Sequence, residues 1–473
     1  MSPTDDEPAR PRGDDHDLVV ANGTVVSPEQ GRFRADVAAD NGQVSHIAAP
    51  GTLDGETVVD ASGNYVLPGV VDPHVHHGLF RPLAAEADTE SRSGLVGGVT
   101  TTGNIFRRGE PYSEIMEGYM TTAEENYRHD YFFTLGLLYD THVAEIPDIV
   151  SELGITSFKW YGNYKLQAAD RFDLKRNLLD DVADRFVQRL AGLDAPTTLA
   201  YHAENAEITE RLTRELREAG ADGYEAIVEK FPGYAEAQAA VAGANLARQH
   251  GYDDEFYVVH VSSRKTAANL AELQSLGYGV TAETCTHYLA LTAEECDQRM
   301  RINPPVRSQA DQDALWTHLR EGTIDCVGTD HIANTREEKL GDDIWDGLWG
   351  SPSSATMLPL VLSEGVNEGR LSLERAAAVT STNSAKAYDL HPKKGAIRVG
   401  SDADLVVVDL EETRTVTPGL LQSAADYTMY EGREVTGWPT QTIVRGTLAY
   451  DRGEVLAQPG HGRHATRPLS RVE

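Results

Sequence analysis

Four short apolar runs in the middle of the chain each end on a residue that could bind a metal, and this pattern restricts the fold more than any other. The runs are Thr156–Lys159, Thr198–His202, Phe256–His260 and Ile324–Asp330. Segments of helical composition lie between them, for example at 180–190, 235–249 and 266–276. Strands and helices in alternation predict a parallel sheet. Because polar residues recur at the carboxyl ends of the strands, we expect an α/β fold, a (β/α)8 TIM-like barrel with its active site at that end.

An earlier segment, Val70–His76, adds two histidines to this set. Side chains two residues apart on a strand point the same way, so His74 and His76 should project from one face. A His-x-His pair can clamp a metal, but it also occurs by chance. A single histidine at a strand end is more often structural, and a single lysine or aspartate there is usually a solvated charge. Six such residues, in this order along the chain, make coincidence improbable, and we predict a metal site.

The two ends of the chain show strand patterns without helices. Short alternating strands between Asp17 and Leu67 are separated by the turn signals Asn22-Gly23 and Asn41-Gly42. Similar strands return within 404–450. Neither end could bury a core alone, so we expect them to pair into one small β-sandwich that the barrel interrupts. The expected divisions are a disordered tail at 1–16, the β-sandwich at 17–67 plus 391–460, the barrel at 68–390, and a C-terminal tail at 461–473.

The net charge of −32 narrows the choice of partners. It argues against nucleic acid and against an anionic membrane surface. Only 9 lysines accompany 33 arginines. An excess of carboxylates with few lysines favours adaptation to concentrated salt and a halophilic-type acidic surface. A GC-rich genome would also explain the lysine deficit, but it explains the carboxylate excess less well.

The sequence also favours a cytoplasmic enzyme. It contains no run of about 18 apolar residues that could span a membrane, and no charged start leads into an apolar signal core. The three cysteines have neither disulfide-scaffold nor zinc-finger spacing. We therefore expect Cys285, Cys296 and Cys326 to be reduced core or loop residues.

Seven short motifs follow one another along the chain. They are Asp72-Pro73-His74-Val75-His76, Ser157-Phe158-Lys159, His202-Ala203-Glu204-Asn205, His260-Val261-Ser262-Ser263, Glu283-Thr284-Cys285, Asn303-Pro304-Pro305-Val306-Arg307 and Gly328-Thr329-Asp330-His331. By their order and spacing, the chain resembles a cyclic amidohydrolase of the dihydropyrimidinase, hydantoinase, dihydroorotase and allantoinase group. The resemblance extends from about Leu18 to about Arg463.

This resemblance implies a site for two divalent metal ions. The implied ligands of the first ion are His74, His76 and Asp330, and those of the second are His202 and His260. In the family, the lysine that matches Lys159 reacts with carbon dioxide. The resulting carbamate (N6-carboxylysine) is an anionic ligand that bridges both ions. Imidazole and carboxylate ligands suit Zn²⁺ best, although Mn²⁺, Fe²⁺ or Co²⁺ could occupy the same positions.

The resemblance also implies a mechanism. A hydroxide that bridges the two metals attacks the ring carbonyl. Asp330 takes up a proton as general base and then returns it, as general acid, to the departing ring nitrogen. Tyr164 stands five residues after Lys159 and matches the family tyrosine that stabilises the oxyanion.

The motifs that select a substrate disagree with one another. His76 is followed by His77-Gly78 and lacks the arginine that dihydroorotases usually carry two residues after the His-x-His pair. In contrast, the stretch Asn303-Pro304-Pro305 resembles the sequence found at this place in dihydroorotases. Arg81 or Arg107 could pair with an anionic substituent of the substrate, or each could form an ordinary surface ion pair. Asn303 and His331 are further candidates for substrate binding.

The leading prediction is therefore metal-dependent hydrolysis of a cyclic amide or ureide, such as a dihydropyrimidine or hydantoin, to an N-carbamoyl amino acid. Dihydroorotase or allantoinase activity is the alternative. A non-catalytic scaffold relative is a third possibility, which the intact set of ligand positions disfavours. The resemblance further implies a homo-oligomer, either a tetramer or a dimer.

Overall fold

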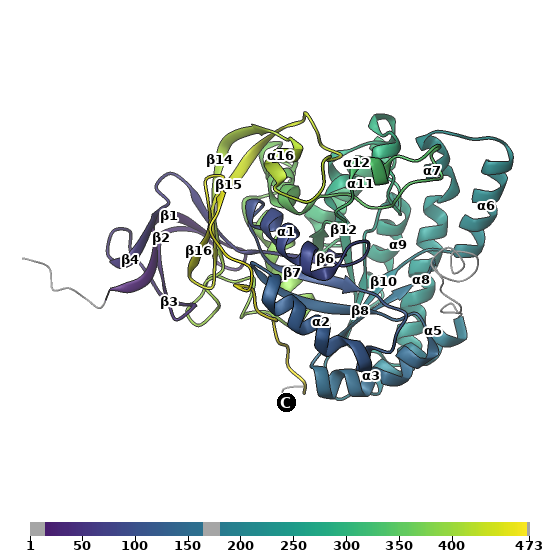
Figure 1. The fold of residues 1–473 in the computed structure, drawn as a ribbon, viewed down its shortest axis with the longest axis horizontal. Helices are drawn as coiled ribbons and strands as arrows, with labels where there is room; N and C mark the ends of the chain where they lie inside the picture. Colours follow the sequence, from purple (N-terminus) through teal and green to yellow (C-terminus); the bar gives the residue numbers. More distant parts are fainter. Residues whose placement is uncertain (1–14, 164–179, 471–473) are drawn as a thin grey trace, which may run out of the picture.

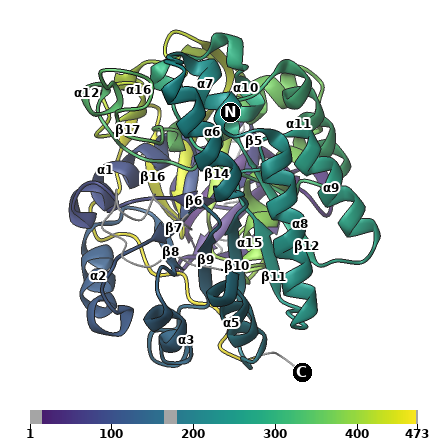
Figure 2. The same cartoon turned by 90° about the vertical axis from the view of Figure 1, so that its right-hand side faces the viewer.

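A barrel of eight parallel strands forms the centre of the molecule. The computed structural model describes residues 15–163 and 180–470. Helices surround the strands of the barrel (Figure 2). The strands follow one another in chain order around the sheet. They are β6 (Val70–Val75), β7 (Val99–Phe106), β8 (Asp130–Gly136), β9 (Ser157–Tyr161), β10 (Thr198–His202), β11 (Glu255–Val258), β12 (Val280–Cys285) and β13 (Cys326–Gly328). A parallel bridge between Val75 and His331 joins the two ends of the sheet, so the predicted barrel is confirmed.

Long helices lie between the strands, as the helical composition predicted. Several of them bury an apolar side; on α5, for example, Val182, Phe186 and Leu190 are buried at helical spacing. The long helices are α1 (Leu83–Val96), α2 (Tyr112–Asn126), α3 (Asp140–Leu153), α5 (Asp180–Ala191), α6 (Ala206–Glu218), α7 (Tyr224–Lys230), α8 (Gly233–Gln249), α9 (Arg264–Ser275) and α11 (Gln309–Glu321). The short ones are α10 (Thr286–Ala290), α12 (Arg336–Lys339), α13 (Met357–Leu360), α14 (Leu373–Ala377), α15 (Asn383–Ala387) and α16 (Pro418–Leu421).

Two barrel strands end earlier than their apolar runs predicted. Strand β11 stops two residues before His260, and β13 stops two residues before Asp330. Both residues have left-handed backbone angles, with φ of 41° at His260 and 48° at Asp330. Left-handed residues cannot continue an extended ladder, and non-glycine residues adopt this conformation at a cost. The strain at two predicted ligand positions is typical of functional sites.

The two ends of the chain together form a second sheet of nine strands, at the side of the barrel (Figure 1). Its strands are β1 (His16–Ser27), β2 (Gly31–Asp40), β3 (Gln43–Ala48), β4 (Gly55–Asp60), β5 (Tyr65–Pro68), β14 (Leu405–Thr415), β15 (Glu434–Val444), β16 (Thr447–Asp451) and β17 (Glu454–Val455). Strand β5 lies between β1 and β14 and so joins the two ends of the chain. This accessory sheet encloses its own hydrophobic cluster, which includes Val20, Val37 and Leu405. The predicted pairing of the two terminal segments is confirmed.

The ranges expected to be tails contain ordered contacts. Strand β1 begins at His16, inside the expected N-terminal tail. Near the other end, His464 bridges to Tyr131, and the buried Arg467 donates a hydrogen bond to Ser157 Oγ at 2.9 Å. The stretch from His464 to Arg467 therefore packs against the barrel. Among the described residues, no helix combines the length and apolar character needed to cross a membrane.

Candidate metal centre

The carboxyl ends of the barrel strands surround a cavity of about 540 Å³. Six predicted ligands line it: His74, His76, Lys159, His202, His260 and Asp330. Each lies on a barrel strand or within two residues of a strand's carboxyl end, and parallel strands of a barrel finish on the same face. The structure thus gathers residues that lie up to 256 positions apart in the sequence.

Asp330 lies against the two histidines of the His-x-His pair. Its Oδ1 atom is 3.3 Å from His74 Nε2 and 3.0 Å from His76 Nε2. One ligand atom from each of the three residues lies within 4.8 Å of the others. Two imidazoles and a carboxylate that converge in this way form a typical donor set for zinc and related divalent metals.

The other three predicted ligands lie beside this group. The ring centroids of His202 and His260 are 4.5 Å apart, and those of His74 and His260 are 5.5 Å apart. Glu204 Oε2 lies 2.9 Å from Nε2 of His202, which leaves Nδ1 as the nitrogen that could bind a metal. Two buried atoms, Lys159 Nζ and His260 Nδ1, have no hydrogen-bond partner within the described ranges. Buried polar atoms are seldom left unpaired, so these two favour a missing ligand.

Burial sets the charge states at this site. It lowers the pKa of His76 to about 4 and also lowers the pKa of His202, so these rings are neutral, as metal ligands must be. Burial lowers the pKa of the Lys159 ammonium to about 7, which makes a neutral amine accessible. For Asp330, burial alone would raise the pKa. The facing imidazoles of His74 and His76 outweigh burial and lower the pKa below its ordinary value, so the carboxylate stays ionised.

Two buried carboxylates behind the ligands were not assigned a role from the sequence. Glu283 accepts a hydrogen bond at 2.8 Å from His74 Nδ1, and its second oxygen accepts one at 3.0 Å from the Tyr257 hydroxyl. Asp72 accepts one at 2.6 Å from the Thr329 hydroxyl, next to Asp330. Such partners fix the orientation of metal-binding side chains. The signal available in the sequence was an acidic residue inside each apolar strand, since a buried carboxylate needs a partner.

Replacing Glu283 with glutamine is expected to lower zinc affinity by about 10- to 100-fold, because a neutral amide holds the His74 ring less firmly. Competition with a chelator measures the affinity. Glu255→Gln is the matched control, because Glu255 begins the neighbouring strand β11 at its far end from the cavity. Unchanged zinc affinity in Glu283→Gln would mean that this carboxylate does not orient the site.

The candidates for substrate binding divide into two groups. Arg107 and Asn303 line the cavity. The guanidinium carbon of Arg107 lies 5.7 Å from the centroid of the Tyr161 ring, and Asn303 Nδ2 donates to Glu204 Oε2 at 2.8 Å. Tyr161, which the sequence did not single out, also lines the cavity, and burial raises its pKa to about 12. Its hydroxyl therefore stays protonated at neutral pH.

The other candidates do not face the cavity. Arg81 donates to the Ala333 carbonyl and forms an ion pair with Glu338 at 2.6 Å, so its role is the ordinary ion pair. His331 is fully buried, with Nε2 2.9 Å from Glu90 Oε2 and Nδ1 accepting from the Ser353 amide at 2.9 Å. Neither side chain belongs to the lining of the cavity, and each is turned toward these other partners. Tyr164 lies outside the described residues.

Comparison with known proteins gives consistent matches along almost the whole chain. The sequence pattern of the amidohydrolase family matches residues 65–449. The L-hydantoinase of Paenarthrobacter aurescens is 31% identical over 469 residues, covering 95% of this chain and 98% of the relative. The allantoinase of Solibacter usitatus is 31% identical over 460 residues, covering 94% of this chain and 96% of the relative. The crystal structure of dihydropyrimidinase from Brevibacillus agri matches with a TM-score of 0.87 at 29% identity, covering 96% of this chain and 100% of that chain.

Proposed function

This chain belongs to the amidohydrolase family, and from that premise we propose that it opens the ring of a cyclic amide or ureide with the help of bound metal. The observation that carries the proposal is the meeting of four histidines, a lysine and an aspartate in one cavity. Relatives named hydantoinase and dihydropyrimidinase favour a hydantoin or dihydropyrimidine ring, opened to an N-carbamoyl amino acid. Allantoinase or dihydroorotase activity is the alternative. The converging ligands disfavour a scaffold without catalysis.

The residues of the cavity fit two divalent ions. His74, His76 and Asp330 would hold one, His202 and His260 the other, and a carbamate on Lys159 would bridge them. Unpaired buried atoms at Lys159 and His260 support this arrangement. When bound, the ions would lower the pKa of a water molecule toward neutrality and polarise the carbonyl under attack. The donor set favours Zn²⁺, with Mn²⁺, Fe²⁺ or Co²⁺ as substitutes.

Asp330 moves the proton in the proposed reaction. As water oxygen bonds to the carbonyl carbon, the ionised carboxylate takes the proton that the water loses. When the carbon–nitrogen bond breaks, Asp330 donates that proton to the ring nitrogen, which leaves as the carbamoyl nitrogen. Because its pKa is lowered, the Asp330 carboxylate is ionised at neutral pH and has a site for that proton. Tyr164 remains the proposed donor to the oxyanion.

Asn303 offers a contact for the ring itself. Glu204 holds its amide nitrogen, while its buried Oδ1 has no hydrogen-bond partner in the described part of the chain. An acceptor fixed in this way matches a ring N–H, which every cyclic amide or ureide presents. We therefore propose that Asn303 binds the substrate.

A panel of cyclic amide and ureide substrates tests the proposed function. The purified protein, supplied with zinc or manganese and bicarbonate in concentrated salt, is incubated with dihydrouracil, hydantoin, dihydroorotate and allantoin. Opening appears as the gain of one water by mass. Opening of any of these rings supports the proposal, and the identity of the ring decides between the leading function and its alternative. A protein that binds metal and opens none of them contradicts both.

Arg107 favours an acidic substituent on the ring, which makes a dihydroorotate-like substrate the second candidate. Arg107→Ala is expected to raise KM by about 10- to 100-fold for acidic rings and to leave neutral rings unaffected, because a charged hydrogen bond contributes about 1.5–3 kcal/mol. Steady-state kinetics on both kinds of ring measure this. Arg81→Ala serves as the control, since Arg81 faces away from the cavity. Equal changes for neutral and acidic rings would exclude charge recognition by Arg107.

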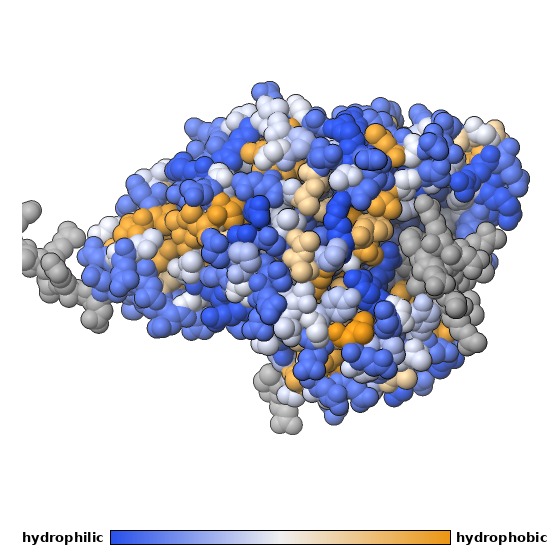
Figure 3. Space-filling view, viewed as in Figure 1, coloured by the Kyte–Doolittle hydropathy of each residue, from blue (hydrophilic) through white to orange (hydrophobic). Residues whose placement is uncertain are grey.

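We also propose that the enzyme works in the cytoplasm as a homo-oligomer, a tetramer or a dimer. Three free cysteines are compatible with a reducing compartment. Hydrophobic side chains gather on one face over the accessory sheet (Figure 3), and Val58 on β4 is 57% exposed. Exposed apolar patches of this kind often mark subunit contacts. Light scattering after size-exclusion chromatography tests the assembly.

A further inference from the structure

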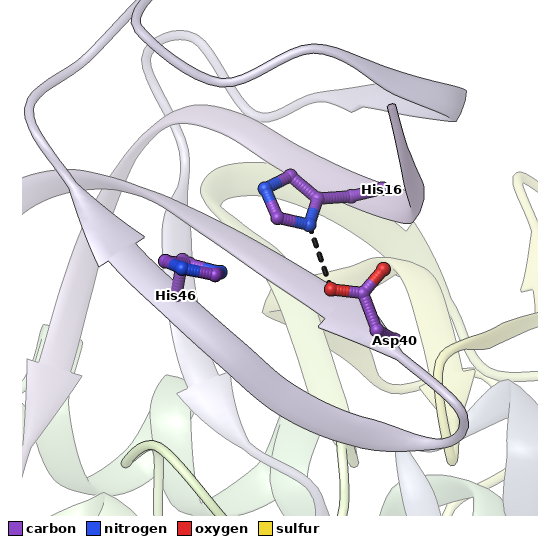
Figure 4. Close-up of side chains that lie close together, drawn as sticks. All are labelled: His16, Asp40 and His46. Atoms are coloured by element: carbon purple, nitrogen blue, oxygen red, sulfur yellow. Dashed lines mark hydrogen bonds and ion pairs between the residues drawn. The ribbon is translucent and has the colours of Figure 1, made fainter. Parts of the chain in front are cut away.

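A second group of two histidines and a carboxylate lies on the accessory sheet, apart from the barrel cavity. His16 begins β1, Asp40 ends β2, and His46 lies on β3 (Figure 4). Nδ1 of His16 is 2.7 Å from Asp40 Oδ2, and the ring centroids of the two histidines are 4.9 Å apart. One ligand atom from each residue lies within 4.8 Å of the others.

Strand pairing brings these side chains together. His46 pairs with Ala38 on β2, and Asp40 follows two residues later, so Asp40 and His46 share one face of the sheet. Strand β1 pairs with β2 on its other side and supplies His16. The Asp17 amide donates to Asp40 Oδ1 at 3.1 Å, which leaves Oδ2 directed toward His16.

This group has the same composition as His74, His76 and Asp330 in the barrel, and in both groups the ligand atoms lie within 4.8 Å of one another. In the described part of the chain, one further group meets the same distance limit, formed by Asp130, Asp402 and Asp404. That group is buried and already holds a cation, since Lys394 Nζ lies 2.9 Å from Asp402 and 2.7 Å from Asp404. The described residues place no lysine or arginine within ion-pair distance of Asp40.

We propose that His16, Asp40 and His46 bind one divalent transition-metal ion in addition to those of the barrel. Two imidazoles and one carboxylate suit zinc, with water completing the coordination. Side-chain exposures of 14% at His16 and 32% at Asp40 leave the group accessible to an ion from solvent. The ion would cross-link β1, β2 and β3. The cross-link would hold β3, the last strand on its side of the sheet, to β1 and β2.

The proposal is tested by measuring how many zinc ions each chain binds. The full-length holoenzyme is dialysed to equilibrium against buffered micromolar zinc, and the metal per chain is measured for wild type and for His46→Ala. His46 is exposed, so its replacement should leave the fold intact. We expect the variant to bind one zinc ion fewer per chain while ring opening stays unchanged. Equal zinc content in the two proteins would overturn the proposal.

His250→Ala is the matched control. His250 Nε2 lies 2.8 Å from Asp184 Oδ1, which makes another histidine–carboxylate pair outside the three groups that could hold a metal. This variant should bind as much zinc as wild type, and an equal loss of zinc here would show adventitious binding to surface histidines. Thermal unfolding gives a second measurement. Zinc should raise the Tm of wild type more than that of His46→Ala or of Asp40→Asn, and identical shifts would contradict a structural site.

Discussion

Lys159→Ala is expected to abolish ring opening, with a loss of at least about 10³-fold in kcat, equivalent to about 4 kcal/mol. The reason is the position of this side chain. Its buried nitrogen shares the cavity with the four histidines and has no hydrogen-bond partner within the described ranges, and its pKa of about 7 makes accessible the neutral amine that carbon dioxide requires. Alanine cannot form a carbamate, so the bridging anion of the proposed centre would be lost. Initial rates and metal content per chain measure the effect together.

Chemical rescue separates this loss from misfolding. Short-chain carboxylates such as acetate or propionate can enter the space that the side chain leaves and supply the missing anion. They should restore part of the activity of Lys159→Ala and none to a misfolded protein. Lys265→Ala removes an exposed lysine on α9 and should behave as wild type. Full activity of Lys159→Ala without rescue would refute the bridged two-metal centre.

Asp330→Asn is expected to keep the fold and to lower kcat by about 10²- to 10⁴-fold, the usual contribution of a general acid–base residue. Asparagine has nearly the same shape and can still contact His74 and His76. It cannot take up a proton, so both the attack of water and the departure of the ring nitrogen lose their proton carrier. Circular dichroism checks the fold, and single-turnover rates measure the chemical step.

Single-turnover rates that are retained in Asp330→Asn would exclude Asp330 as the proton carrier. His331 could not simply replace it, since both of its ring nitrogens are engaged, one with Glu90 and the other with the Ser353 amide. The metal content of Asp330→Asn separates a lost ligand from a lost proton carrier, because a pure proton-transfer defect leaves both ions bound.

Much of the fold and the central site could be predicted from local patterns. The residues of β10 match their apolar run, and helices such as α5 and α8 lie within two residues of the segments with helical composition. Hydrophobic periodicity specifies such elements because each must bury one face. The six candidate ligands could be named because each belongs to an apolar run of about strand length, and the carboxyl ends of parallel strands meet on one face of a barrel.

Contacts between distant segments could not be predicted in this way. Glu283 and His74 are 209 residues apart and share a hydrogen bond. Arg81 and Arg107 looked equivalent in the sequence, yet Glu338 holds one outside the cavity while the other lines it. The direction of a long side chain depends on partners that the fold brings near, and sequence spacing does not carry that information.

The sequence by itself determined the alternation of strands and helices, the pairing of the two terminal segments and the residue types at the strand ends, because these follow from periodicity over a few neighbouring residues. Only the tertiary structure decided which polar groups meet. The left-handed backbone at Asp330 turns it toward His74 and His76, while the next residue, His331, is held by Glu90. Strand register likewise brings Asp40 and His46 to one face. Contacts of this kind depend on long-range packing, which fixes the position and direction of each side chain.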